Sequence, residues 1–113
     1  MLKPGEIVHI ITRRLFEGDL RRHFVGDVLD CDNALLRVKG NLFVLDQGIN
    51  EFVKMASVRE RIFSLHDNGL IINVLPSGLD IDLLTYDDDH QGHLALTDGK
   101  EFRLEINEFS SRR

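Results

Sequence analysis

The chain has 113 residues, of which 42% are hydrophobic and 29% charged, and this size and composition exclude a disordered chain. Its single cysteine cannot form an internal disulfide, Met1 to Glu6 lack the apolar stretch of a signal peptide, and no apolar run reaches the about 18 residues of a membrane helix. The net charge of −5 disfavours nonspecific nucleic-acid binding, since domains that bind polyanions are usually basic. We therefore expect one cytoplasmic domain over residues 1–113.

Short apolar stretches separated by Asp, Asn and Gly clusters are typical of β-strands joined by tight turns. The expected strands are 6–13, 21–29, 34–39, 42–46, 50–54, 60–66, 70–75, 92–97 and 101–107. One short helix is expected over 78–85, because Ser77 to Asp80 form a capping box with Leu79, Leu83 and Leu84 on one face of the following turns. These elements predict a mainly β fold, a small antiparallel barrel or roll with one short helix, ending in a frayed tail over 110–113.

The segment from Thr12 to Phe24 contains two arginine pairs on either side of a turn. An anion-binding site is predicted here, formed by Arg13, Arg14, Arg21, Arg22 and His23. Arginine forks bind phosphate or carboxylate oxygens in a bidentate manner, and Phe16 and Phe24 offer stacking faces. The alternative is a solvated edge ribbon in which Glu6, Glu17, Asp19 and Asp27 neutralise the arginines. Farther along, Cys31 is flanked by Asp30 and Asp32, whose charges disfavour a reactive thiolate.

Two further turns interrupt the middle of the chain. Gly40-Asn41 predicts a turn between strands 34–39 and 42–46, and Asp67-Asn68-Gly69 predicts a hairpin that joins 60–66 to 70–75. The last of these strands is apolar on both faces. Its interaction residues are Leu70, Ile71, Ile72, Val74 and Leu75. We expect them to contact a partner protein or a second copy in a two-fold dimer, the alternative being a strand central in a closed fold.

The acidic segment Asp87 to His93 is the candidate metal site. Its candidate ligands are Asp87, Asp89, His90 and His93. Carboxylates and imidazoles bind zinc or manganese, but the spacing matches no calcium loop. The alternative is a polar hairpin connection.

The Thr97-Asp98-Gly99 sequence predicts a three-residue hairpin loop with Gly99 in the left-handed conformation. In that register Leu94 lies opposite Phe102 and Leu96 opposite Lys100. Leu94, Leu96, Phe102 and Leu104 then share the buried face.

No catalytic residue set and no cofactor motif is evident. The leading hypothesis is a non-enzymatic binding or protein-interaction module. The second is an anion-binding domain for RNA, DNA or a phosphorylated ligand at the arginine cluster. A metal-dependent enzyme at the Asp87–His93 loop is third.

Overall fold

The computed structural model describes residues 1–13, 21–67, 69–88 and 93–106. The chain divides into two compact units, 1–79 and 80–113, and each contains its own sheet. Antiparallel strands dominate both units, which confirms the predicted mainly β fold. The prediction of a single domain remains a prediction, and the expected tail over 110–113 lies outside the described residues.

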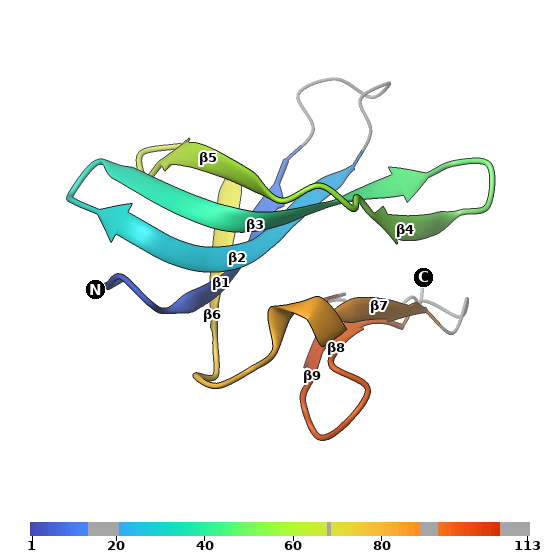
Figure 1. The fold of residues 1–113 in the computed structure, drawn as a ribbon. Coiled ribbons are helices and arrows are strands. Elements are labelled where there is room, and N and C mark those ends of the chain that lie inside the picture. The colour runs from blue at the N-terminus through green and yellow to red at the C-terminus, as the bar shows by residue number, and fades with distance from the viewer. Residues whose placement is uncertain (14–20, 68, 89–92, 107–113) are drawn as a thin grey trace. The chain divides into compact units, whose positions relative to one another are not determined.

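Six strands form one antiparallel sheet in the described part of residues 1–79 (Figure 1). They are β1 (Ile7–Thr12), β2 (Arg22–Cys31), β3 (Leu35–Asp46), β4 (Glu51–Lys54), β5 (Arg59–Ser64) and β6 (Leu70–Leu75). The strand order is β4-β3-β2-β1-β6, and β5 pairs with β3. β5 pairs with the first half of β3 and β4 with its last residues, so β4 and β5 together form one edge of the sheet and β6 forms the other.

The sheet curls around an apolar core, as a roll would. The buried cluster takes Val8 and Ile10 from β1, Phe24 from β2 and Val38 from β3. Half-buried residues from both edges pack against the same cluster, namely Phe63, Leu65, Leu70 and Ile72. Residues from opposite edges reach one cluster because the sheet is curved. It is not a closed barrel, since no pairing between β5 and β6 occurs among the described residues.

The predicted turn at Gly40-Asn41 is wrong, because β3 runs through it as one strand. Gly40 lies opposite Gly26 of β2, and the two backbones approach closely. A Cβ atom built on Gly40 would lie 2.5 Å from Cα of Gly26, so no larger residue fits without a backbone shift. Asn41 is buried and its Nδ2 donates to the carbonyl oxygen of Met55 at 3.1 Å. These two residues thus serve strand packing rather than a turn.

The predicted hairpin between 60–66 and 70–75 is also wrong. β5 pairs with β3, whereas β6 pairs with β1. The connection 65–69 therefore leads from one edge of the sheet to the other, and backbone hydrogen bonds hold it at both ends. Leu65 N donates to Ala34 O at 2.7 Å, and Arg13 N donates to Gly69 O at 2.9 Å. The curl of the sheet makes this short crossing possible.

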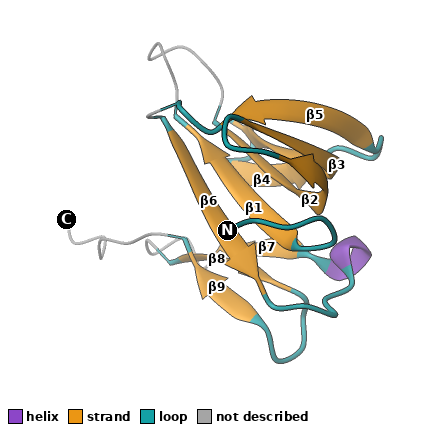
Figure 2. Cartoon of the chain, turned by 90° about the vertical axis from the view of Figure 1, so that its left-hand side faces the viewer, coloured by secondary structure: helices purple, strands orange, loops and turns teal. Residues whose placement is uncertain are grey.

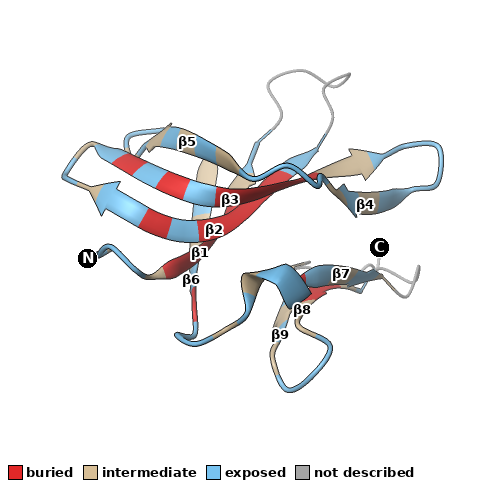
Figure 3. Cartoon of the chain, in the orientation of Figure 1, coloured by how far each residue is buried: buried red, intermediate tan, exposed pale blue. Residues whose placement is uncertain are grey.

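The central strands are buried on both faces (Figure 3). Because side chains alternate along a strand, the face opposite the apolar cluster carries the odd-numbered residues of β1 and the first part of β2. Its buried residues are Ile7, His9, His23, Val25, Asn41, Phe43 and Leu75. The two histidines lie side by side there, with ring centroids 5.4 Å apart.

The second unit contains an antiparallel sheet in the order β7 (Thr85–Asp88), β8 (Leu94–Thr97) and β9 (Arg103–Glu105). Leu96 lies opposite Leu104, so the predicted register with Lys100 is wrong by four residues. The loop is longer because Asp98 Oδ1 accepts from both Lys100 N and Phe102 N. A shift by four preserves the face, and Leu96 is fully buried with Leu104 half-buried. Phe102 lies in the loop.

The short helix predicted over 78–85 is present only as one turn. Figure 2 shows this single helical turn, the 3-10 turn η1 (Ile81–Leu83). Asp80 caps it, since its Oδ1 accepts from Asp82 N at 3.0 Å. Gly78 has a φ of +86°, which is incompatible with a right-handed helix, so the predicted start is wrong. Thr85 then begins β7, a strand that the run of aspartates had concealed. No helix among the described residues is long and apolar enough to cross a membrane.

Candidate anion-binding site

A cavity of about 270 Å³ lies within residues 1–79, where β1 ends, β2 begins and β5 ends. Its lining residues are Thr12, Arg22, His23, Phe24, Leu42, Arg61, Ile62, Phe63, Ser64, Asp67 and Leu70. They come from five strands and from the connection before β6. The curl of the sheet is what assembles this set, because β2 and β5 are separated in the sheet by β3.

Two arginines line the cavity on the face of the sheet that carries the apolar cluster. Arg22 lies opposite Val44 and Arg61 opposite Val38. The guanidinium carbon of Arg61 lies 5.9 Å from the ring centroid of Phe24. Within the described ranges neither arginine makes an ion pair, whereas Arg37 lies 4.0 Å from Glu60. Two guanidinium groups therefore line the cavity without being held in an ion pair by a described carboxylate, and Asp67 is the one described carboxylate in the lining.

Polar residues line the cavity together with the two arginines. Thr12 and Ser64 are among the lining residues, and the Oγ atom of Ser64 accepts from His66 N at 3.2 Å. Asp67 also lines it, but its Oδ1 accepts from Gly69 N at 2.7 Å and so holds the turn before β6. Hydroxyl donors and guanidinium forks together suit an oxyanion such as phosphate.

The aromatic residues of the cavity are part of the core. Phe24 is 2% exposed and its ring centroid lies 5.6 Å from that of Phe63. Its ring is covered by Phe63 and Arg61, so Phe24 does not offer the stacking face that its sequence position suggested. Phe16 lies outside the described residues.

The predicted arginine cluster is divided by the structure. Arg22 lines the cavity. Arg13 is not among the lining residues and lies against Gly69, where a built Cβ atom would be 3.4 Å from Arg13 Nε. Arg21 is exposed, and alternation assigns it to the other face of the sheet. Arg14 lies outside the described residues.

Arg61 is the residue that sequence reasoning missed. The alternation of Arg59, Arg61 and Phe63 along one strand face was a usable signal. It was lost because 60–66 was paired with 70–75 instead of with β3, which left Arg61 far from Arg22.

His23 does not act with the arginines. Its ring stacks on Phe52 at 4.6 Å between centroids and lies edge-on to His9, on the opposite face from Phe24. Burial, reinforced by the charges of His9 and Arg21, lowers the pKa of His23 to about 3. Burial alone lowers the pKa of His9 to about 4. Both imidazoles are therefore neutral near pH 7, and His9 Nδ1 lies 3.2 Å from Asn73 Nδ2.

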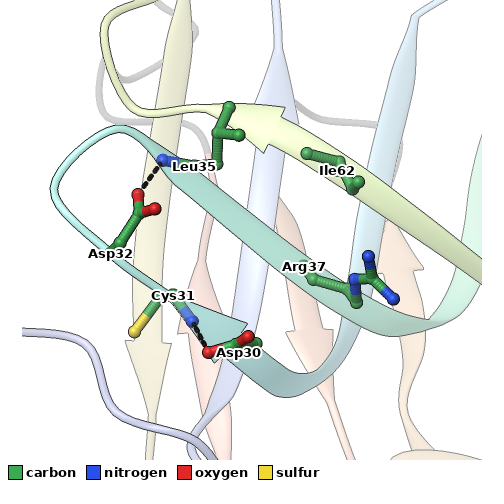
Figure 4. A pocket seen from close by; sticks show the side chains of 6 residues that line it. All are labelled: Asp30, Cys31, Asp32, Leu35, Arg37 and Ile62. Atoms are coloured by element: carbon green, nitrogen blue, oxygen red, sulfur yellow. Dashed lines mark hydrogen bonds between the residues drawn. The ribbon is translucent and has the colours of Figure 1, made fainter.

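A second cavity, of about 200 Å³, lies at the end of β2 (Figure 4). Asp32 holds the β2–β3 turn, because its Oδ1 accepts from Ala34 N and Leu35 N, and these bonds lower the pKa of its carboxyl. The thiol of Cys31 donates to Leu2 O at 3.0 Å, and Figure 4 shows its sulfur turned away from Arg37 and Ile62. This cavity mixes charges of both signs and presents no free nucleophile.

The predicted metal loop lies partly outside the described residues, which leave out Asp89 and His90. Asp87 Oδ2 accepts from a terminal guanidinium nitrogen of Arg103 at 3.0 Å, and Arg103 also binds Glu105. His93 is exposed. Within the described part of the chain no three His, Cys, Asp or Glu side chains are grouped to hold a metal ion. The metal-site hypothesis thus gains no supporting geometry.

No known protein family, curated protein or solved structure matches this chain. The cavity between Arg22 and Arg61 is therefore the strongest guide to its function.

Proposed function

We propose that this chain is a non-enzymatic binding module and that it binds the phosphate group of a small ligand between Arg22 and Arg61. The observation that carries the proposal is the pair of arginines, neither held in an ion pair among the described residues, that line one cavity together with Thr12 and Ser64. Guanidinium groups bind phosphate oxygens bidentately, and they do so more strongly where water is partly excluded.

A small ligand fits this cavity better than a nucleic-acid strand. Its volume of about 270 Å³ is at the lower limit of small-molecule pockets. Proteins that bind single strands use exposed aromatic rings for stacking, and Phe24 is buried. Residues 1–79 carry ten Lys and Arg against ten Asp and Glu, so no broad basic surface surrounds the cavity.

Binding is favoured over catalysis by the state of the polar groups. Asp67 is engaged with the backbone of the turn, and the buried His23 is neutral and packed on the far face. The cytoplasmic location expected from the sequence is kept as part of this proposal.

The test is a titration of the chain with pyrophosphate at low salt, followed by two-dimensional amide NMR. We expect the signals of Arg22, Arg61 and Ser64 to shift first. Arg22→Gln and Arg61→Gln should each weaken binding about tenfold, since a hydrogen bond to a charged group contributes about 1.5–3 kcal/mol. Arg59→Gln is the matched control, because Arg59 lies on the same strand but does not line the cavity.

Equal weakening by Arg59→Gln would mean that general electrostatics, not this cavity, attracts the anion. Absence of shifts at millimolar pyrophosphate would refute the proposal. An oligothymidylate that binds at the same residues, with affinity rising with its length, would identify single-stranded nucleic acid as the ligand instead.

A protein-interaction module is the second candidate function. It is favoured by a different observation: β6 carries no charged side chain and, within the described part of the chain, pairs with β1 alone.

A further inference from the structure

β6 ends the sheet without any charged side chain. Among the described residues it pairs with β1 alone. Ile71 is 48% exposed and Val74 is 54% exposed, on opposite faces of the strand. Exposed edge strands normally carry charges, prolines or bulges that prevent pairing with another chain. Leu70 to Leu75 contain none of these, so the edge is open to another strand.

The hydrogen-bond pattern shows which backbone groups face outward. Arg13 N donates to Gly69 O, so the odd-numbered residues of β1 bond to β6. Since bonding alternates along an antiparallel ladder, Ile71, Asn73 and Leu75 are the residues that β1 satisfies. The N–H and C=O groups of Ile72 and Val74 point away from β1. An added strand would meet these two residues.

A cavity of about 460 Å³ lies next to this edge. It is lined by Met1, Leu2, Glu6, Cys31, Asp32, Leu65 and Val74. Most of these side chains are apolar, and Glu6 and Asp32 add two carboxylates. Glu6 accepts a hydrogen bond from Lys3 N, and Asp32 accepts from Ala34 N and Leu35 N. It shares no residue with the Arg22–Arg61 cavity.

The edge and the cavity fit one ligand. Residues opposite each other in an antiparallel pair point to the same face, so the residue paired with Val74 would point into this cavity. Residues two positions away share that face, and Glu6 and Asp32 line the same cavity as Val74.

We propose that β6 binds an extended peptide segment of a partner protein, which adds a strand to the sheet. One apolar side chain of the peptide fills the cavity next to Val74. A basic side chain of the peptide, two positions from the apolar one, lies near the carboxylates of Glu6 and Asp32. Main-chain hydrogen bonds to Ile72 and Val74 supply affinity, and the cavity supplies specificity, as in other strand-addition complexes. This inference is independent of the proposed phosphate site.

A second copy of the chain fits the edge less well. Two β6 strands paired about Asn73 would place Ile72 of the partner subunit opposite Val74. Ile72 already packs against its own core, so it has no side chain to place in the cavity. A second copy would also bring no positive charge to Glu6 and Asp32, since β6 has none.

The test uses the full chain and a capped peptide, Thr-Lys-Thr-Leu-Thr-Lys-Thr. Amide NMR titration should shift Leu2, Leu65, Ile72 and Val74. A peptide with glutamate in place of both lysines should bind more weakly, by at most about thirtyfold, because each of two exposed ion pairs contributes at most about 1 kcal/mol. The double variant Glu6→Gln, Asp32→Asn should remove most of that difference, while the new amide oxygen at position 32 still accepts from the backbone of the turn.

Val74→Lys should abolish binding, because a lysine on an edge strand prevents pairing and repels the basic peptide. Val58→Lys is the control, since Val58 is 59% exposed and does not line the cavity. Three results would overturn the proposal. They are no shifts at millimolar peptide, equal loss with Val58→Lys, and a dimer by light scattering whose β6 amides are protected without peptide.

Discussion

The two edges of the larger sheet differ in the side chains that they present to another chain. The β4/β5 edge carries Glu51, Lys54, Arg59, Glu60 and Arg61, whereas β6 carries no charge at all. Both edges pair on one side only among the described residues, yet the charged one is protected against pairing with other chains. The charged edge contributes Arg61 to the Arg22–Arg61 cavity, which Leu70 of β6 also lines, and the uncharged edge contributes Val74 to a mostly apolar one. The comparison indicates that side-chain charge distinguishes the two edges of one sheet, and the two proposals above assign them different kinds of ligand.

The largest expected effect is a loss of stability in acid. It is caused by His9 and His23, which are buried in β1 and β2 between the two edges of the sheet. Folded pKa values of about 4 for His9 and about 3 for His23 lie below the unfolded value of 6.5. The unfolded chain therefore binds more protons, and the free energy of unfolding falls as the pH drops from 6.5 to 4. We expect a loss of up to about 3 kcal/mol for each histidine. Urea denaturation at several pH values measures it.

The matched variants separate the buried histidines from the rest of the chain. His9→Gln should flatten the pH dependence by one histidine's share, while His66→Gln, at an exposed position, should leave it unchanged. A free energy of unfolding that is constant from pH 6.5 to 4 would contradict the neutral, buried state of both rings.

The next effect concerns the close approach of β2 and β3, where Gly26 lies opposite Gly40. Gly40→Ala should destabilise the fold by about 2–3 kcal/mol, because the new Cβ atom would meet the backbone of Val25 and Gly26. Gly48→Ala is the control, since there the Cβ atom meets the side chain of Asp46 at 3.2 Å and no backbone. Thermal or urea unfolding measures both. Equal losses in the two variants would show that the close approach of β2 and β3 is not required.

The sequence predicted strands better than their partners. Alternation and turn residues identified most strands, because these signals are local. The Asp67–Gly69 turn predicts a hairpin between neighbouring strands, but the connection leads from one edge of the sheet to the other. The predicted pairing of 60–66 with 70–75 also hides that Arg61 and Arg22 line one cavity. At Asp98 the sequence named the turn but missed two side-chain hydrogen bonds that lengthen it. Local patterns do not encode such contacts.

A smaller effect is expected when a negative charge is removed from the Arg22–Arg61 cavity. Asp67 is the carboxylate among the described lining residues of the Arg22–Arg61 cavity, and its charge opposes the proposed binding of an anion there. Asp67→Asn removes the charge and keeps an oxygen for Gly69 N, so pyrophosphate should bind about threefold more tightly, in line with a weak, partly solvated repulsion of under about 1 kcal/mol. Isothermal titration calorimetry measures the change. Glu60→Gln, on β5 but away from the lining, should have no such effect.

The smallest expected effect tests whether β6 is an open edge. Val74→Lys should change the free energy of unfolding by less than about 0.5 kcal/mol, because the side chain is half exposed and a lysine there reaches water. The neighbouring variant Leu75→Lys should cost several times more, since Leu75 is 5% exposed and a buried charge is poorly tolerated. Urea denaturation of both variants measures the difference. If Val74→Lys proved as costly as Leu75→Lys, Val74 would belong to a covered surface in solution, and the edge of β6 would already be occupied. A small loss of unfolding free energy for Val74→Lys and a large one for Leu75→Lys is expected of an edge strand. In such a strand the side chain of Leu75 packs in the core while that of Val74 is exposed.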